Sequence, residues 1–197
     1  MIDPDLECIA RIKNGDGQGL DTLMERHIEA LHRFIFRYTN NREDAADIAQ
    51  ETFVRVFRKA DSYKPKATVK TWVYTIALNL CRDRARRAAR VKWIPFLRAS
   101  EGNDPGFGIE DVVADSHDDP SDAAGVTELE NAVAKSIEGL PEKLRVPFVL
   151  CVLESHSQAE AARMMNVTPK TIEVRIYRAR FHLRDSLEPI LRDFGRL

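Results

Sequence analysis

Residues 157–183 have the sequence SQAEAARMMNVTPKTIEVRIYRARFHL, which predicts two helices joined by a short turn. Ser157 and Glu160 form the S-x-x-E pattern of a capping box, which satisfies free N–H groups at the start of a helix. Asn166 tolerates the left-handed backbone of a turn, and Pro169 suits the first position of the second helix because a missing N–H costs nothing there. A short helix, a turn and a second helix are the parts of a helix-turn-helix.

The second helix of this pair has a basic outer surface. Ile172, Ile176 and Leu183 recur at helical spacing and predict its buried side. The side chains on its other sides are candidates for contact with base edges and phosphates in a DNA major groove. They are Lys170, Thr171, Glu173, Val174, Arg175 and Arg178. A helical hairpin with a solvated basic surface is the alternative that this segment alone leaves open.

Helical periodicity also dominates the N-terminal part of the chain. Apolar residues recur at helical spacing, and no alternating run of β-branched residues predicts a strand. We expect helices at about residues 6–13, 20–38, 42–60 and 68–92, with residues 39–41 breaking the second from the third. The predicted buried side of the third helix includes Phe53, Val56 and Phe57. The helical pattern resumes at Glu128 and continues to the C-terminus, so the predicted fold class is all-α.

Between the two helical parts, residues 93–127 combine prolines, glycines and acidic residues. This composition is typical of a linker rather than of a packed element. We therefore expect two small helical domains, residues 1–92 and 128–197, joined by a flexible acidic linker at residues 93–127.

Charge is distributed unevenly, although the formal net charge is only −1. Residues 82–92 are strongly basic and residues 100–122 strongly acidic, so local attraction to phosphate is expected despite the balanced total. The 3 cysteines are far apart and no Cys/His cluster has metal-site spacing, so we predict no disulfide framework, metal or other cofactor. No apolar run approaches the ~20 residues that span a bilayer, and no residue set suggests catalysis. These features predict a cytoplasmic protein that is not an enzyme.

Separate blocks of sequence carry a resemblance to a known family. Residues 41–53 (NREDAADIAQETF) and 70–83 (KTWVYTIALNLCRD) resemble region two of bacterial RNA polymerase sigma factors. Residues 140–143 (LPEK) and 171–180 (TIEVRIYRAR) resemble region four. The length and the lack of a third domain are similar to the extracytoplasmic-function (ECF) group. The resemblance covers nearly the whole chain except the linker.

The resemblance implies a promoter-specificity subunit that binds core RNA polymerase, double-stranded promoter DNA and the melted non-template strand. It also implies an anti-sigma factor as a partner, with no membrane insertion and no small-molecule substrate. In this family the outer face of the third helix docks on the largest polymerase subunit. That role falls here to Asp47, Gln50, Glu51, Arg55 and Arg58, for which a merely solvated charged surface is the alternative.

The resemblance also assigns recognition of the minus-ten element to residues 61–68 and to the helix that follows them. Capture of a base flipped out of the duplex needs stacking and hydrogen bonds that offset the cost of unstacking. Tyr63 is the candidate for stacking and Asn79 for a base edge, whereas Trp72 is expected in the core. Phosphate contacts fall to Lys64, Lys66, Arg82, Arg84, Arg86 and Arg87. The helix-turn-helix is assigned to the minus-thirty-five element.

The sequence departs from the family pattern in the second helix of the pair, and it also bears on two rival functions. Glu173 occupies a place that is often basic in the family, so the minus-thirty-five sequence recognised here is expected to differ. The acidic linker either occupies an RNA path or is a plain tether. An ordinary helix-turn-helix repressor would need only residues 128–197, and the N-terminal blocks argue against it. The basic residues after Asn79 argue against a decoy that binds only an anti-sigma factor.

Overall fold

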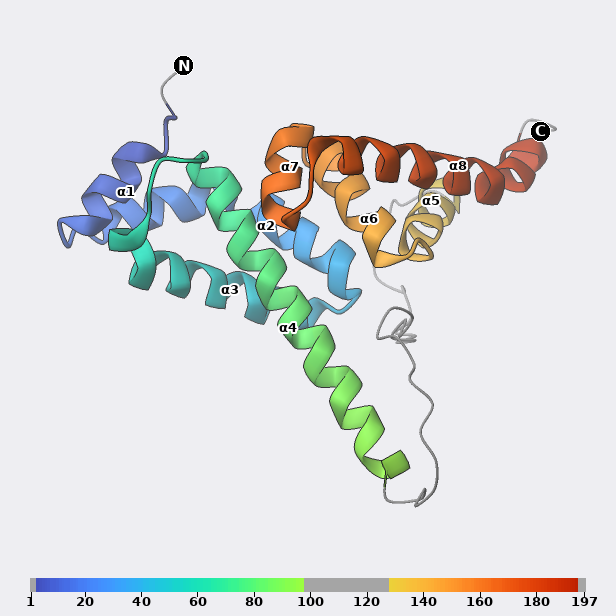
Figure 1. Cartoon of the computed structure of the whole chain (residues 1–197), viewed down its shortest axis with the longest axis horizontal. Coiled ribbons are helices and arrows are strands. Elements are labelled where there is room, and N and C mark those ends of the chain that lie inside the picture. The colour runs from blue at the N-terminus through green and yellow to red at the C-terminus, as the bar shows by residue number, and fades with distance from the viewer. Residues whose placement is uncertain (1–2, 98–127, 195–197) are drawn as a thin grey trace.

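The computed structural model describes residues 3–97 and 128–194, and every regular element in these two ranges is helical (Figure 1). The all-α fold class is therefore confirmed. No helix in the described part of the chain is long and apolar enough to cross a lipid bilayer. In chain order, the elements are α1 (Leu6–Lys13), α2 (Gln18–Thr39), α3 (Arg42–Lys59), η1 (Ala60–Ser62), α4 (Val69–Leu97), α5 (Glu128–Glu138), α6 (Glu142–Phe148), η2 (Val149–Leu153), α7 (Gln158–Met165) and α8 (Pro169–Phe194).

α1 to α4 pack into a first bundle around a core of large apolar side chains. Phe34 of α2 and Tyr74 of α4 are fully buried, with their ring centroids 5.3 Å apart. Gly19 allows α1 and α2 to approach closely, because a Cβ at this position would lie 2.7 Å from the carbonyl oxygen of Cys8. α2 ends at Thr39 and is followed by Asn40, which has a φ of 49°, so the predicted break between the second and third helices is confirmed.

α5 to α8 form a second bundle, in which an irregular turn brings two polar residues inward. α6 runs directly into η2, a segment of π-helix. After it, the N–H of Glu154 donates to the carbonyl of Val149 at 3.0 Å, and the N–H of His156 donates to the carbonyl of Leu150 at 2.9 Å. Because of this turn, Glu154 and His156 are only 7% and 4% exposed.

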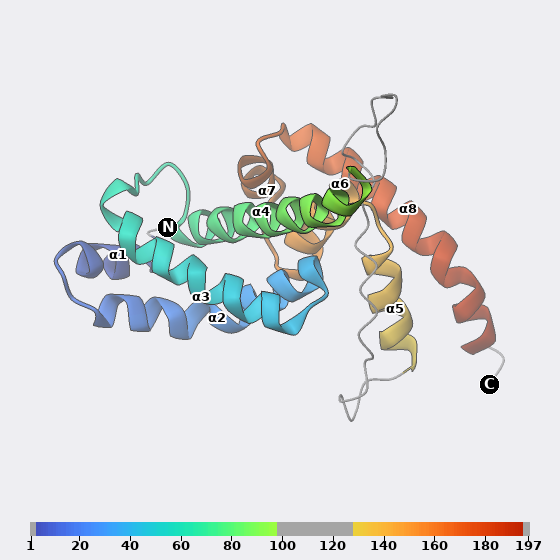
Figure 2. The ribbon, with the colours of Figure 1, turned by 90° about the horizontal axis from the view of Figure 1, so that it is seen from below.

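The two bundles contact each other along α4. α7 packs against α4, and η2 touches α2 (Figures 1 and 2). α4 then extends away from the bundles and ends at Leu97, rather than near residue 92 as expected from the sequence. The helix therefore continues into the first residues of the predicted linker. The rest of that prediction, residues 98–127, lies outside the described residues.

Candidate nucleic-acid and protein interfaces

The predicted helix-turn-helix is present in the structure as α7, a three-residue turn and α8. Ser157 Oγ accepts a hydrogen bond from the N–H of Glu160 at 3.2 Å, and Glu160 Oε2 accepts one from the N–H of Ser157 at 2.9 Å. The predicted capping box is therefore confirmed. Asn166 has a φ of 55°, as a left-handed turn residue does. Thr168 Oγ1 accepts from the N–H of Thr171 at 3.2 Å and so caps the first turn of α8.

The predicted DNA-facing residues of α8 lie outside its buried stripe, which consists of Ile172, Ile176, Ala179 and Leu183. Lys170, Glu173 and Arg178 are exposed, Val174 is 39% exposed, and Thr171 and Arg175 are half-buried. Within this set, the Lys170 ammonium lies 3.0 Å from both carboxylate oxygens of Glu173. This face of α8 therefore carries less free positive charge than its sequence suggests, because Lys170 is already paired with Glu173. The candidates are Lys170, Thr171, Glu173, Val174, Arg175 and Arg178.

Tyr63, in the loop between η1 and α4, is placed differently from the prediction. Its side chain is only 7% exposed and packs on Trp72, with ring centroids 5.0 Å apart. Its hydroxyl donates to the carbonyl of Ala67 at 2.6 Å. The prediction that Tyr63 offers a stacking surface to a flipped base is therefore wrong for this conformation, because the ring supports the loop from inside. Lys64 and Lys66, by contrast, are exposed on the loop.

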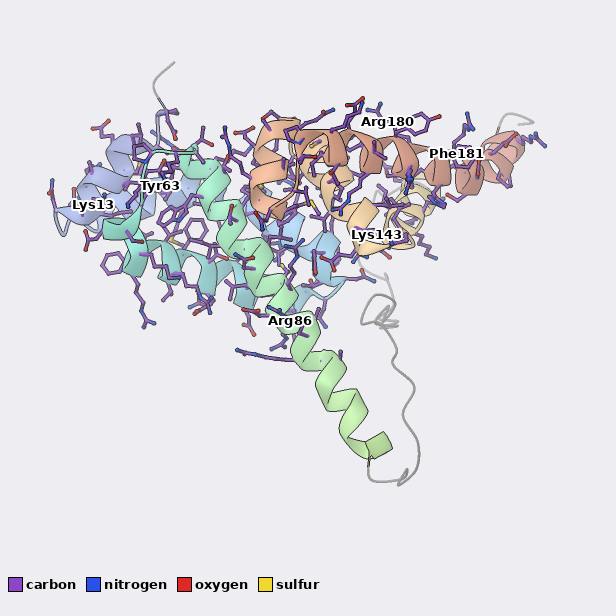
Figure 3. The ribbon with its side chains drawn as sticks, in the orientation of Figure 1. Lys13, Tyr63, Arg86, Lys143, Arg180 and Phe181 are labelled. Carbon is purple, nitrogen blue, oxygen red and sulfur yellow. The ribbon has the colours of Figure 1, made fainter. Side chains whose placement is uncertain are left out.

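The N-terminal segment holds the same loop in place, and sequence reasoning missed this. Asp3 Oδ2 accepts a hydrogen bond from the N–H of Val69 at 2.7 Å, which caps the first turn of α4. The Lys13 ammonium lies 3.5 Å from the carbonyl oxygen of Tyr63, and Figure 3 shows both residues at this end of the first bundle. The cap spans 66 residues of sequence, so no local pattern could have revealed it.

The basic run of α4, residues 82–92, begins shortly after Asn79. The Asn79 side chain is exposed, as a residue that contacts a base must be. Several arginines of the basic run have acidic neighbours in the structure. Arg84 pairs with Asp44, Arg86 pairs with Asp83, and Arg82 Nε lies 3.2 Å from Glu142 Oε1. Arg86 projects from the part of α4 that leaves the bundle (Figure 3). Arg84, Arg86 and Arg87 are all exposed. A DNA phosphate that binds Arg84 or Arg86 would therefore replace only a solvent-exposed ion pair with Asp44 or Asp83.

An apolar groove of about 630 Å³ runs between α2 and α3. The sequence pattern had placed Phe57 in the core, but its side chain is 50% exposed and lines this groove. At 100° per residue, Phe57 falls beside Ala46 and Gln50 at the edge of the buried stripe, which explains the error. The groove is lined by Leu20, Met24, Ile28, His32, Ala46, Ala49, Gln50, Phe53, Val54, Phe57 and Arg58.

The five residues predicted to bind polymerase divide between the groove and the open face of α3. Gln50 and Arg58 line the groove. Glu51 and Arg55 pair with each other on the outer face, with Arg55 Nε 2.8 Å from Glu51 Oε1. Asp47 is exposed on the same helix. The structure thus adds an apolar surface to what the sequence predicted as a charged one.

A second groove, of about 530 Å³, lies between η2, the start of α7 and α8. Cys151 and Val152 line one side, and Tyr177 and Arg180 line the other. Tyr177 is 72% exposed. The neighbouring Phe181, labelled on α8 in Figure 3, is 49% exposed. Sequence reasoning did not identify this surface, because both aromatic residues fall between polar positions of a basic helix.

The cysteines do not offer a reactive thiolate. Burial raises the pKa of the Cys81 thiol to about 12 and that of Cys151 to about 11, so both stay protonated near neutral pH. Within residues 3–97 and 128–194, no three His, Cys, Asp or Glu side chains are grouped as metal ligands would be. The exposed cations, hydrogen-bonding groups and apolar side chains of these surfaces are suited to binding DNA and proteins.

Comparisons with known proteins match both bundles. The family model of sigma-70 region 2 matches residues 23–91, and that of sigma-70 region 4 matches residues 130–183. The chain is 30% identical over 182 residues to the ECF RNA polymerase sigma factor SigW of Bacillus subtilis, with 92% of this chain and 96% of SigW covered.

Two solved structures show the same fold over most of the chain. CnrH, in complex with the cytosolic domain of CnrY, has a TM-score of 0.67 and 26% identity, and the match covers 94% of this chain and 97% of CnrH. The sigma factor RpoE of Bartonella quintana, in complex with the anti-sigma factor NepR, has a TM-score of 0.63 and 23% identity, with 85% of this chain and 96% of RpoE covered.

Proposed function

Because the chain belongs to the ECF group of RNA polymerase sigma factors, we propose that its two bundles divide promoter recognition between them. The chain is a promoter-specificity subunit that directs transcription initiation by core RNA polymerase. In our proposal, residues 1–92 bind the polymerase and the minus-ten element, residues 128–197 bind the minus-thirty-five element, and residues 93–127 connect them.

The observation that carries this proposal is the apolar groove beside the family's polymerase-docking helix. An exposed apolar surface of this kind is characteristic of a protein interaction site. Phe57 supplies an aromatic anchor at the groove, while Gln50 and Arg58 supply polar contacts at its edge. Asp47, Glu51 and Arg55 extend the contact over the open face of α3.

Promoter contact at the minus-ten element falls to the loop and to α4. We assign phosphate contacts to Lys64 and Lys66 and a base contact to Asn79, all of which are exposed. The duplex upstream is held by the exposed basic part of α4, whose contacts release counterions and make binding depend on salt. Tyr63 supports the loop from within, since its hydroxyl and ring are already engaged.

At the minus-thirty-five element, α8 enters the major groove. Arg175 is the residue that we assign to base recognition, and Arg178 contacts a phosphate. Glu173 is held by Lys170 in the free chain. On DNA, Lys170 can turn to a phosphate, which leaves the Glu173 carboxylate to accept a hydrogen bond from a cytosine amino group.

The protein acts where the polymerase acts, in the bacterial cytoplasm, and catalyses no step itself. We further propose that an anti-sigma protein binds the chain and blocks it. The structure of CnrH in complex with the cytosolic domain of CnrY supports a protein partner of this kind. The apolar groove between α2 and α3 and the groove of mixed polarity beside α8 are the surfaces such a partner would cover.

Run-off transcription from a randomised promoter library, with purified core polymerase and the full chain, tests the function. The expected result is selection of two sequence elements and no transcripts from the library without the chain. Arg175→Glu should abolish selection at the minus-thirty-five element while polymerase binding is retained. If the chain neither binds core polymerase nor selects promoters, the proposed function is wrong.

A further inference from the structure

The groove between η2, the start of α7 and α8 combines an apolar lining with a polar edge. Its apolar lining comes from Val152, Val174 and the buried Ile176, and the two valines are each 39% exposed. Tyr177, the most exposed aromatic residue of this lining, adds an amphipathic ring. The volume of about 530 Å³ is within the range of pockets that enclose a ligand, so the groove can take side chains of a partner.

Arg180 supplies the free positive charge of this groove. Its side chain is exposed on the outer side of α8 (Figure 3), and it has no hydrogen-bond or ion-pair partner in residues 3–97 and 128–194. The carboxylate that also lines the groove, that of Glu173, is already paired with Lys170 at 3.0 Å. The groove therefore attracts a negatively charged group to the Arg180 side of its edge.

A polar atom of the lining residues is left without a partner. His156 lines the groove and is only 4% exposed, and its Nε2 is buried with no hydrogen-bond partner in the part of the chain that the structure describes. Buried polar atoms are almost always hydrogen-bonded, because an unpaired one destabilises the folded state. A ligand that brings a hydrogen-bonding group to this atom would remove that cost, so the orphaned nitrogen points to a ligand.

The mixture of apolar and charged groups favours a protein segment over a nucleic acid. Protein–DNA interfaces are more polar and more positive than this groove, in which a phosphate would meet the Glu173 carboxylate. Tyrosine and arginine beside an apolar pocket are instead typical of the residues that dominate binding between proteins. An amphipathic helix that carries apolar and acidic side chains on one face would fill the lining and pair with Arg180.

We propose that this groove binds an acidic amphipathic segment of a partner protein, with an apolar side chain against Val152 and Ile176 and a carboxylate at Arg180. Glu173 and Val174 belong both to the groove and to the face of α8 that we assign to the minus-thirty-five element. The segment and the promoter duplex therefore compete for α8. The competition rests on the proposed function, but the docking does not. Beyond the cover by an anti-sigma protein proposed above, this defines the chemistry of the segment and the DNA element that it displaces.

Selection from a library of random peptides displayed on phage, with the full chain as bait, tests the docking. Peptides of about 16 residues are long enough for about four helical turns. Sequences that combine Leu, Ile or Phe with Asp or Glu at helical spacing should be enriched. If no acidic amphipathic peptide is enriched, the proposal is refuted.

Fluorescence anisotropy with an enriched acidic peptide then locates its site. Tyr177→Ala and Arg180→Glu should each weaken binding by about 10-fold or more, and both change exposed side chains, so folding is little at risk. Phe181→Ala and Arg184→Glu are matched controls, because they make the same kinds of change at exposed positions of α8 that do not line the groove. Both should bind the peptide as the parent chain does.

Reversal of charge gives a second readout of the same contact. A peptide with Lys in place of its acidic residues should bind Arg180→Glu more tightly than it binds the parent chain, and Arg184→Glu should show no such gain. If Tyr177→Ala and Arg180→Glu bind the acidic peptide as tightly as the parent chain does, this groove is not the docking site.

A labelled duplex that carries the minus-thirty-five element, taken from the promoter library, tests the competition. The acidic peptide should displace this duplex from the full chain, and excess unlabelled duplex should displace the labelled peptide. If the peptide binds in the groove without displacing the duplex, the competition is refuted. If no acidic peptide is enriched and Tyr177→Ala and Arg180→Glu weaken binding of the duplex about 10-fold, the groove contacts DNA and the proposal is wrong. Failure of the parent chain to support run-off transcription would refute the proposed function and leave the peptide docking standing.

Discussion

Asp3 accepts a hydrogen bond from the backbone N–H of Val69 at 2.7 Å, so the first residues of the chain cap the helix that carries the basic run. The other oxygen of Asp3 accepts from the N–H of Asp5 at 3.0 Å. The carboxylate of Asp5 is in turn held by Arg26 at 2.9 Å and His27 at 2.6 Å, both on α2. Two aspartates thus join the starts of α1 and α4 to α2.

Asp3→Ala should impair melting of the promoter more than it impairs binding to polymerase. Loss of a helix cap costs about 1 kcal/mol, and here it also frees the loop at residues 61–68. The measurement compares run-off transcription from a duplex promoter with that from one already unpaired at minus ten. We expect a several-fold loss on the duplex and little loss on the unpaired template. Asp21→Ala, an exposed acid on α2, provides the control. Equal losses on both templates would contradict a role in melting.

Phe57→Ala should weaken binding to core polymerase with little effect on stability. The side chain is 50% exposed, so its removal leaves almost no cavity. An aromatic anchor in a docking groove contributes about 2 kcal/mol, which corresponds to roughly 30-fold in affinity. Phe181→Ala is a matched control, because Phe181 is 49% exposed but lies on α8. Fluorescence anisotropy measures the affinity of each variant for core polymerase. We expect a much larger loss of affinity for Phe57→Ala than for Phe181→Ala. A larger loss for Phe181→Ala would refute the groove as the polymerase site.

Local sequence signals predicted much of the fold. The capping box at Ser157 and the turn at Asn166 depend on residues a few positions apart, and both are present in the structure. The break at Asn40 was found in the same way. Such features are encoded within one or two helical turns, so they can be identified without knowledge of the tertiary structure.

Contacts between distant segments could not be predicted. Nothing near Glu154 in sequence indicates that Arg37, 117 residues away, neutralises it. Tyr63 was predicted to stack on a flipped base because the family resemblance places its loop at the minus-ten element, but its ring packs on Trp72 and its hydroxyl donates to the carbonyl of Ala67. Phe57 was predicted in the core but is half exposed, because helical periodicity alone does not show where a buried stripe ends. The roles of the other candidate site residues stay predictions.

Glu173→Ala should change the base preferred at one position of the minus-thirty-five element and leave the minus-ten preference intact. In the free chain its carboxylate binds Lys170 at 3.0 Å, so the substitution also releases a cation toward phosphate. We therefore expect binding to become stronger overall and less selective, with the loss of a cytosine preference. Sequencing of transcripts from the promoter library measures both effects. Unchanged preference at every minus-thirty-five position would show that Glu173 does not contact a base.

His156 should make the stability of the chain fall between about pH 7.5 and pH 5. Burial, with a smaller contribution from Lys70, lowers the pKa of His156 to about 4, while the negative charge of Glu160 opposes this only in part. Its pKa in the unfolded chain is about 6.5, so the unfolded state binds a proton first as the pH falls. The stabilisation by the neutral ring is therefore complete above about pH 6.5 and is lost as the pH falls toward 4.

At about pH 5 the expected loss is about 2 kcal/mol, from ~1.36 kcal/mol per unit of pKa difference. Glu160 does not contribute in this window, because its pKa of about 2 affects stability only below about pH 4.5. Urea unfolding of His156→Phe, which keeps a ring against Tyr74, should show a clearly smaller loss of stability between the two pH values. His182→Phe, at an exposed position on α8, should behave as the parent does. If His156→Phe loses as much stability as the parent, the buried neutral ring is not the source of the acid sensitivity.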